Sequence, residues 1–158
     1  ANRMGGRVRV TGLRGDSPQG DRAIERLLDC LSGTIDLKNT PDLGPVLAIA
    51  AAAAPGVTRL TGAARLRLKE SDRLAAMARL IRALGGRAEE APDGLTIFGG
   101  PLRGGAAPGA GDHRVVMSAA LAATVCREPV TILGAEAVEK SYPHFFRDYQ
   151  RLGGRILP

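Results

Sequence analysis

The stretch Lys69-Glu70-Ser71-Asp72-Arg73 stands directly before a run of apolar residues with helical spacing. The apolar positions of that run lie 3, 7 and 10 residues after the first: Leu74, Met77, Ile81 and Leu84. This spacing predicts a helix with one buried face. Ser71 is the expected N-cap with Asp72 in the first turn, and Gly85-Gly86 is the expected end of the helix.

Lys69 and Arg73 conflict with the electrostatics of this predicted helix start. A cation beside a helix N-terminus costs roughly 0.3–1 kcal/mol. An anion bound in front of the turn would remove the conflict, because it would meet free backbone N–H groups and two side-chain cations. The alternative is an exposed helix start whose own acidic neighbours compensate the two cations. This stretch alone leaves both interpretations open.

The composition indicates a globular chain with a positive charge. Its 158 residues are 44% hydrophobic, 24% charged and 3% aromatic, and they include no Trp. The length fits one domain or a piece of a larger protein, with a core of Ala, Leu, Val and Ile. The net charge is +6, but the basic residues are scattered and aromatics for base stacking are few. A small, multiply anionic substrate therefore fits better than nucleic acid.

Cysteine and histidine positions give no metal-binding pattern. Cys30 and Cys126 lie far apart in apolar surroundings, which predicts two buried free thiols in a reducing compartment. Together with His113 and His144 they match no metal-ligand spacing. The chain shows no signal peptide, and its longest apolar run, 46–54, is too short to span a bilayer. We therefore expect a cytoplasmic protein without a membrane partner.

A second helix is predicted after Thr40-Pro41-Asp42. Thr is a capping residue, Pro suits the first helical position, and an acid suits the first turn. The following residues, 43–54, are apolar on every side, so this helix is expected to be buried among other elements. Asp42 would then be a carboxylate fixed at the tip of a central helix. A lone Asp in a first turn is more often only a cap.

The other expected elements alternate between strands and helices. Strands are expected at 6–11, 35–37, 57–61, 87–91, 95–98 and 130–133, with a hairpin turn at Pro92-Asp93-Gly94. Helices are expected from Gln19-Gly20-Asp21-Arg22, over 112–125 as a second buried helix, and from Glu139 through Leu152. Residues 99–111, rich in Gly and Pro, are expected to form a mobile linker.

The polar motifs recur at regular intervals. Val10-Thr11-Gly12 and Leu60-Thr61-Gly62 are 50 positions apart, Asp42 and Asp112 are 70 apart, and Lys69 and Lys140 are 71 apart. An α/β architecture of repeated units follows, with the buried helices at the centre and about two units and the start of a third present.

The repeat strengthens the anion hypothesis. Four cations fall in or beside the first turn of an expected helix: Arg22, Arg73, Arg114 and Lys140. In symmetry-related units, several such helix starts could surround one pocket. The alternative is that each cation pairs with its own acidic neighbour.

These motifs resemble, in order, those of the 5-enolpyruvylshikimate-3-phosphate synthase (3-phosphoshikimate 1-carboxyvinyltransferase) family over essentially the whole chain. The motifs are Gln19-Gly20-Asp21-Arg22, Pro41-Asp42, residues 68–73, Asp112-His113-Arg114 and Lys140-Ser141-Tyr142-Pro143. The resemblance implies an enolpyruvyl transferase-like inside-out α/β barrel domain of βαβαββ units. It also implies that residues 1–158 are the C-terminal segment of an enzyme with a second domain, and that they supply most of one domain.

The resemblance also implies site roles. Asp42 resembles the base on the 5-hydroxyl of shikimate 3-phosphate, and Glu70 the acid that protonates the methylene of phosphoenolpyruvate. Lys69 and Arg65 occupy positions that contact shikimate 3-phosphate. The positions that contact phosphoenolpyruvate are Arg73, Arg114, Lys140 and His113. The chemistry agrees, because addition to the enol carbon needs one base, one acid and several cations, and no metal or other cofactor.

Some features depart from the family pattern. The family's N-terminal segment and second domain are absent from the sequence, Arg65 stands where many members have Asn, and His144 stands where an acid is common. We therefore expect a monomer of the shikimate pathway enzyme, which leads to chorismate and the aromatic amino acids, that lacks turnover by itself. Two alternatives remain: a domain like that of UDP-N-acetylglucosamine enolpyruvyl transferase, and a non-catalytic anion-binding module.

Overall fold

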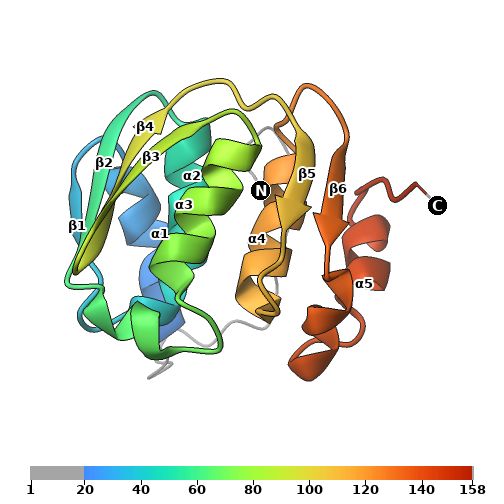
Figure 1. Ribbon diagram of the computed structural model, residues 1–158, viewed down its shortest axis with the longest axis horizontal. Coiled ribbons are helices and arrows are strands. Elements are labelled where there is room, and N and C mark those ends of the chain that lie inside the picture. Colours follow the sequence, from blue (N-terminus) through green and yellow to red (C-terminus); the bar gives the residue numbers. More distant parts are fainter. Residues whose placement is uncertain (1–19, 158) are drawn as a thin grey trace.

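Two strand–helix–strand crossovers organise residues 20–157, the part of the chain that the computed structural model describes (Figure 1). In chain order, with η for a 3-10 helix, the elements are η2 Gly20–Ala23, α1 Ile24–Leu27, η3 Leu28–Cys30, β1 Thr34–Asp36, η4 Pro41–Leu43, α2 Gly44–Ala53, β2 Gly56–Thr61, η5 Ala64–Leu68, α3 Arg73–Ala83, β3 Arg87–Ala91, β4 Gly94–Gly99, β5 Gly105–Pro108, α4 His113–Ala123, β6 Val130–Leu133, η6 Ala135–Lys140 and α5 Phe145–Arg151. The strand expected over 6–11 lies outside the described residues.

The strands form two separate sheets. The first has the order β1-β2-β4-β3, in which β1 and β2 are parallel and the β3–β4 hairpin is antiparallel to β2. Ala91 pairs with Gly94, so Pro92 and Asp93 form the hairpin loop at the expected place. The second sheet pairs β5 with β6 in parallel. Because parallel neighbours need a crossover, α2 connects β1 to β2 and α4 connects β5 to β6.

The internal repeat predicted from the sequence is present in the fold. Each crossover ends in a left-handed glycine, Gly62 with φ +63 and Gly134 with φ +73. Each glycine precedes a 3-10 helix, and Lys69 follows η5 just as Lys140 ends η6. An amphipathic helix comes next, α3 in one unit and α5 in the other. The described residues therefore contain two related units and helix α1.

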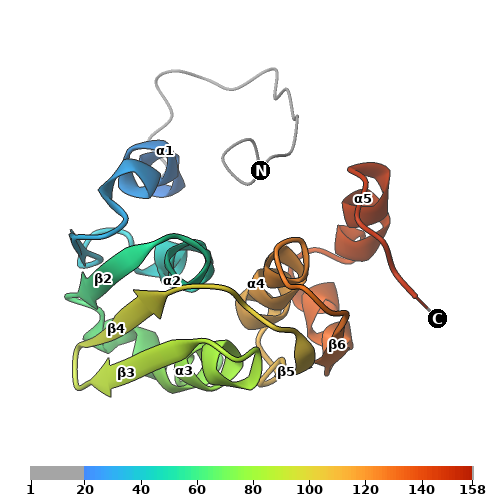
Figure 2. The ribbon, with the colours of Figure 1, turned by 90° about the horizontal axis from the view of Figure 1, so that it is seen from above.

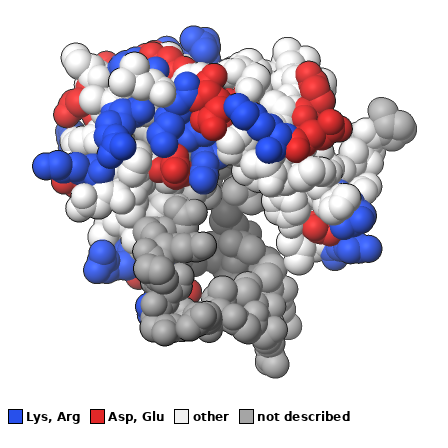
Figure 3. Space-filling model, turned by 90° about the horizontal axis from the view of Figure 1, so that it is seen from below, with Lys and Arg blue, Asp and Glu red and all other residues white. Residues whose placement is uncertain are grey.

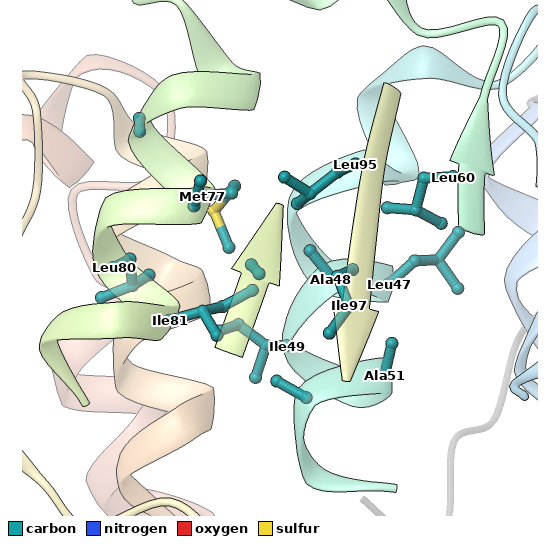
Figure 4. Packing of buried hydrophobic residues seen from close by; sticks show 14 of the residues in the cluster. Leu47, Ala48, Ile49, Ala51, Leu60, Met77, Leu80, Ile81, Leu95 and Ile97 are labelled. Atoms are coloured by element: carbon teal, nitrogen blue, oxygen red, sulfur yellow. The ribbon is translucent and has the colours of Figure 1, made fainter. Parts of the chain in front are cut away.

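The central helices are buried, as their composition predicts. Helices α2, α3 and α4 contact one another; α2 and α3 pack on the first sheet, and α3 and α4 on the second (Figure 2). Figure 4 shows Leu47 and Ile49 of α2, Ile97 of β4 and Ile81 of α3 within the shared core, and all four are at most 1% exposed. Ala107 of β5 and Val115 of α4 belong to the same buried cluster. Burying a Leu or Ile side chain contributes about 1.5–3 kcal/mol, so the cluster holds the two sheets and three helices in one unit.

Four details differ from the expectations. Asp72, not Ser71, caps α3, because its Oδ1 accepts the backbone N–H of Ala75. Thr40 makes no capping bond, and the 3-10 turn η4 precedes α2. The last helix, α5, begins at Phe145, because η6 and a turn occupy the residues before it. Cys30 is exposed and Cys126 is only half-buried, although both are free thiols.

The segment 99–111 is not only a linker. It contains strand β5, whose small residues pair along the whole of β6 from Gly105↔Val130 to Pro108↔Leu133. Gly104 and Gly105, with φ +120 and +112, let the chain turn into this strand. The sequence lacks the β-branched residues that usually indicate a strand, so β5 owes its conformation to the pairing with β6.

Candidate active site

Charged side chains gather on the face where α3 and α4 begin, which Figure 3 shows directly. Three short segments bring them together. The turn η4 carries Asp42 just before α2, residues 69–72 lead into α3, and Asp112 caps α4. Because η4 and Asp112 occupy related places in the two units, the internal repeat accounts for their meeting at one site.

Arg73 is the centre of the site. Its side chain is 1% exposed and its guanidinium meets three carboxylates. Nε donates to Asp112 Oδ2 at 2.8 Å, Nη1 donates to Asp42 Oδ1 at 2.9 Å, and Nη2 donates to Glu70 Oε2 at 2.6 Å. The positive charge at the start of α3 is therefore compensated by the protein's own acids. Compensation by an acidic neighbour, the alternative considered above, is thus present in the contact with Glu70, but Arg73 itself is buried and not exposed.

Asp112 is a site residue that the sequence did not single out by itself. It is fully buried, caps α4 by accepting the N–H of Arg114 at 2.9 Å, and accepts a second bond from Ser71 Oγ at 3.0 Å. These bonds together with Arg73 hold the pKa of Asp112 below its ordinary 3.8, although burial acts to raise it. Asp112 thus fixes the start of α3 to the start of α4. Only its place in the repeat, 70 positions after Asp42, could have indicated this role.

Among the described residues, Asp42 is the carboxylate that the largest number of cations approach. Lys69 Nζ lies 3.2 Å from Oδ1, and Arg114 Nη2 lies 3.8 Å from Oδ2. Arg114 also donates to the Asp42 carbonyl at 3.2 Å. Burial acts to raise the pKa of Asp42, but Lys69, Arg114 and Arg73 hold it below 3.8. Its side chain remains 36% exposed, so this carboxylate is ionised and open to solvent.

Glu70 accepts a hydrogen bond from Nη2 of Arg73, the guanidinium whose Nη1 donates to Asp42. Its own backbone N–H is the main cause that holds its pKa below the ordinary 4.5, and Arg73 acts in the same direction. The carboxyl is therefore ionised at neutral pH in this arrangement. A role as an acid requires a change that raises this pKa, such as an anion arriving nearby.

The remaining predicted residues divide into two groups. His113 is the first residue of α4 and is buried, and its Nδ1 has no hydrogen-bond partner among residues 20–157. Arg65 and Lys140 are exposed, and neither side chain makes a hydrogen bond or ion pair within the described part of the chain. Arg22 is exposed in η2. Of the four cations expected beside helix starts, only Arg73 and Arg114 contact the same carboxylate, that of Asp42, within the described residues. Lys140 ends a 3-10 helix instead of starting a helix.

A cavity of about 200 Å³ opens beside this cluster, between the start of α2, one side of α4 and the first residue of α5. Asp42, Arg114 and Ser118 form its polar part, and the rest is apolar: Pro45, Val46, Met117, Leu121 and Phe145. Among the described residues, no three His, Cys, Asp or Glu side chains are arranged to hold a metal ion. The three carboxylates around Arg73 face a guanidinium instead.

Comparison with known proteins agrees with this architecture. The chain is similar to the solved EPSP synthase of Acinetobacter baumannii, with a TM-score of 0.66 and 41% identity over 70% of this chain and 26% of that one. A second structure of that enzyme gives a TM-score of 0.64 with 35% identity. The fold is that of the enolpyruvyl transferases.

The family follows from the sequence comparison. The family model described as EPSP synthase (3-phosphoshikimate 1-carboxyvinyltransferase) matches residues 2–149, and the chain belongs to this family. A 3-phosphoshikimate 1-carboxyvinyltransferase of Clostridium acetobutylicum is 40% identical over 97% of the chain, and one of Methanocella arvoryzae is 43% identical over 96%. The chain spans about 40% of the length of these relatives. The predicted resemblance is thus confirmed.

Proposed function

We propose that this chain supplies one domain's share of an EPSP synthase site. The whole enzyme would transfer the enolpyruvyl group of phosphoenolpyruvate to the 5-hydroxyl of shikimate 3-phosphate and release phosphate. One observation carries the proposal: Asp42 is held by Lys69 from the segment before α3, by Arg73 of α3 and by Arg114 of α4, and Glu70 is held by the same Arg73. A base that takes a proton from an alcohol carrying phosphate and carboxylate groups must itself be ionised, and solvent-accessible cations beside it can bind those groups.

The proposed roles follow the chemistry. Asp42 accepts the proton of the 5-hydroxyl while the hydroxyl oxygen bonds to C2 of phosphoenolpyruvate. Glu70 gives a proton to C3. The intermediate then loses phosphate, which takes the proton held by Asp42, while a C3 proton returns to Glu70 and the double bond is restored. Two carboxylates suffice for these proton transfers, and no metal or other cofactor is proposed.

Binding is proposed to rest on two sets of cations. Lys69 and Arg65 would hold shikimate 3-phosphate, and Arg114, Lys140, Arg73 and His113 would hold phosphoenolpyruvate. Arg114 and Lys69 are about one-third exposed and can meet a ligand directly. Arg73 is covered, so it would meet an anion only after Glu70 or Asp42 moves aside. Asp42 and Glu70 each accept one bond from Arg73, at Nη1 and Nη2, and a ligand carboxylate or phosphate could accept both as a bidentate partner.

The chain alone is proposed to bind phosphoenolpyruvate weakly and to lack turnover, because it covers only part of its relatives' length. The full site would need residues from a second domain. We further propose a cytoplasmic monomer that binds neither nucleic acid nor membrane. No helix within residues 20–157 is long and apolar enough to cross a membrane.

A titration of the ¹⁵N-labelled chain tests the proposal. Phosphoenolpyruvate and shikimate 3-phosphate should shift the amide signals of residues 69–73 and 112–114. Arg114→Ala should abolish these shifts, whereas Arg79→Ala, an exposed cation farther along α3, should preserve them. Salt-sensitive binding of random DNA without response to either small ligand would favour the anion-binding module instead. Robust phosphate release by the chain alone would overturn the proposed lack of turnover.

A further inference from the structure

Arg67 lies outside the group of charged residues around Arg73 and connects η5 to the β3–β4 hairpin and to the start of α3. Its Nε donates to the Pro92 carbonyl at 3.0 Å, its Nη2 donates to the Ala91 carbonyl at 2.8 Å, and its Nη1 donates to Asp72 Oδ2 at 2.7 Å. The first two acceptors belong to the turn of the β3–β4 hairpin. The third belongs to the N-cap of α3. One planar guanidinium therefore connects the first sheet to the start of the helix that carries Arg73.

The two carboxylate oxygens of Asp72 have different partners. Oδ1 accepts the N–H of Ala75 at 3.0 Å and caps α3, while Oδ2 receives Arg67. Burial acts to raise the pKa of Asp72, but the Ala75 N–H and Arg67 hold it below 3.8. The carboxylate is thus ionised, and its bond to Arg67 is charge-assisted, which makes it one of the stronger classes of hydrogen bond.

The contact between Arg67 and Asp72 closes a short loop. The residues between them are 68–71, which include Lys69 and Glu70. Leu68 is the last residue of η5 and is 88% exposed, and no helix or strand covers residues 69–71. The backbone N–H of Ala63 also donates to the Asp93 carbonyl at 2.7 Å. The hairpin therefore holds η5 at two places, at Ala63 before its first residue and at the Arg67 side chain near its last. The segment is therefore held at its two ends by the hairpin and by Asp72, while between them the side chains of Lys69, Glu70 and Ser71 contact the charged residues of the site.

We propose that Arg67 is a positioning residue: by fixing 68–71 between the hairpin turn and Asp72, it places Lys69 and Glu70 at the site without touching the ligand. The effect on the ligand rests on the proposed function, but the effect on the segment does not. Lysine could not replace it, because a single ammonium on a flexible stem cannot reach a planar set of three acceptors in fixed geometry.

Arg82 offers a matched control. Its Nε and Nη2 donate to the Ala88 carbonyl at 2.9 and 2.7 Å, and its Nη1 lies 3.6 Å from Glu90. It therefore joins α3 to the same hairpin, and to the same Glu90 that lies 3.8 Å from Arg67, but it does so away from residues 68–71. Arg82→Ala measures what the hairpin contact contributes to stability alone.

The experiment measures backbone ¹⁵N relaxation and hydrogen exchange of Lys69, Glu70 and Ser71. It compares the unaltered chain with the variants Arg67→Ala, Arg67→Lys and Arg82→Ala. The two Arg67 variants should mobilise these amides, while the Nε–H signal of Arg73, bonded to Asp112, stays protected. Arg82→Ala should leave the amides unchanged. Unchanged amides in a folded Arg67 variant, or equal mobility in Arg82→Ala, would overturn the proposal. Arg67→Lys, which keeps the charge and the aliphatic stem, gives the decisive spectrum if Arg67→Ala does not fold.

A ligand measurement completes the test. Phosphoenolpyruvate affinity should fall about two- to thirtyfold in the Arg67 variants, the range typical of residues that act on a site without contacting it. Arg82→Ala should retain the affinity of the unaltered chain. An unaltered chain that binds no phosphoenolpyruvate would refute the proposed function, whereas the relaxation data would still decide the role of Arg67. Equal losses of affinity in the Arg67 and Arg82 variants would reduce Arg67 to a purely structural residue.

Discussion

Arg73 Nε and Asp112 Oδ2 lie 2.8 Å apart, with both side chains almost completely removed from solvent. This pair connects the first residue of α3 to the cap of α4, and so joins the two repeat units where their helices begin. A buried cation would be costly without such partners. The same bond that orients the site therefore also contributes to folding.

Removing the Asp112 carboxylate should destabilise the chain strongly. We expect Asp112→Ala to lower the free energy of unfolding by about 3 kcal/mol, because a buried Arg73 loses its innermost partner. Urea unfolding followed by circular dichroism measures this change. Glu89→Ala, which breaks the exposed pair with Arg87, should cost less than about 1 kcal/mol. Equal losses in the two variants would show that Asp112 is dispensable for the fold.

Stability should fall in acid. The pKa values of Asp42, Asp72 and Asp112 lie below 3.8 and that of Glu70 lies below 4.5 in the folded chain. The unfolded chain then binds more protons than the folded chain in this range. The contribution of these groups is complete above the unfolded pKa values and is lost as pH falls through the folded ones. Urea midpoints should therefore be flat from pH 7 to about 5 and decline below it. Midpoints that rise on acidification would contradict this.

The two glycines that end the crossovers should differ in tolerance. Alanine at Gly62 or Gly134 has to adopt a left-handed conformation, which costs about 1–2 kcal/mol. At Gly62 the new Cβ would also overlap Asp36 Oδ1, whereas at Gly134 its nearest neighbour is Glu136 Oε1 at 3.9 Å. We expect Gly62→Ala to lower the thermal midpoint more than Gly134→Ala. The reverse order would show that the overlap with Asp36 does not limit substitution at Gly62.

The sequence predicted the elements with strong local patterns. The apolar face predicted for α3 consists of Leu74, Met77, Ile81 and Leu84, and all four are at most 2% exposed. The recurring motifs also predicted that the chain contains repeated structural units. It misplaced the cap of α3, because Ser71 and Asp72 are both good caps and only the distant Asp112 draws the Ser71 hydroxyl away. It missed β5 because Gly105–Pro108 becomes a strand only through pairing with β6.

Site prediction had the same limit. Asp42, Lys69, Glu70, Arg73 and Arg114 do meet, as their related positions implied. Local patterns could not show that Arg73 would be saturated by three acids, because two of those acids lie 31 and 39 residues away. The same applies to Arg67, whose acceptors in the hairpin turn lie 24 and 25 residues along the chain.

Ligand binding should be coupled to proton uptake at Glu70. The cluster holds three carboxylates against three cations: Asp42, Glu70 and Asp112 against Lys69, Arg73 and Arg114. An arriving anion unbalances it and competes for Arg73, and both effects raise the pKa of Glu70. Calorimetric titration with phosphoenolpyruvate near pH 6 should give enthalpies that depend on whether the buffer is MES or imidazole, because protons come from the buffer.

Two variants separate this uptake from the protonation of the ligand itself. Glu70→Gln cannot take up the proton, so the difference between the two buffers should shrink. Glu89→Gln, an exposed position on β3, should leave the difference as it is in the unaltered chain. If Glu70→Gln and the unaltered chain show the same buffer dependence, Glu70 stays ionised when phosphoenolpyruvate binds. A carboxylate that stays ionised could not protonate the methylene carbon, and the acid would have to be sought among the other groups of the site.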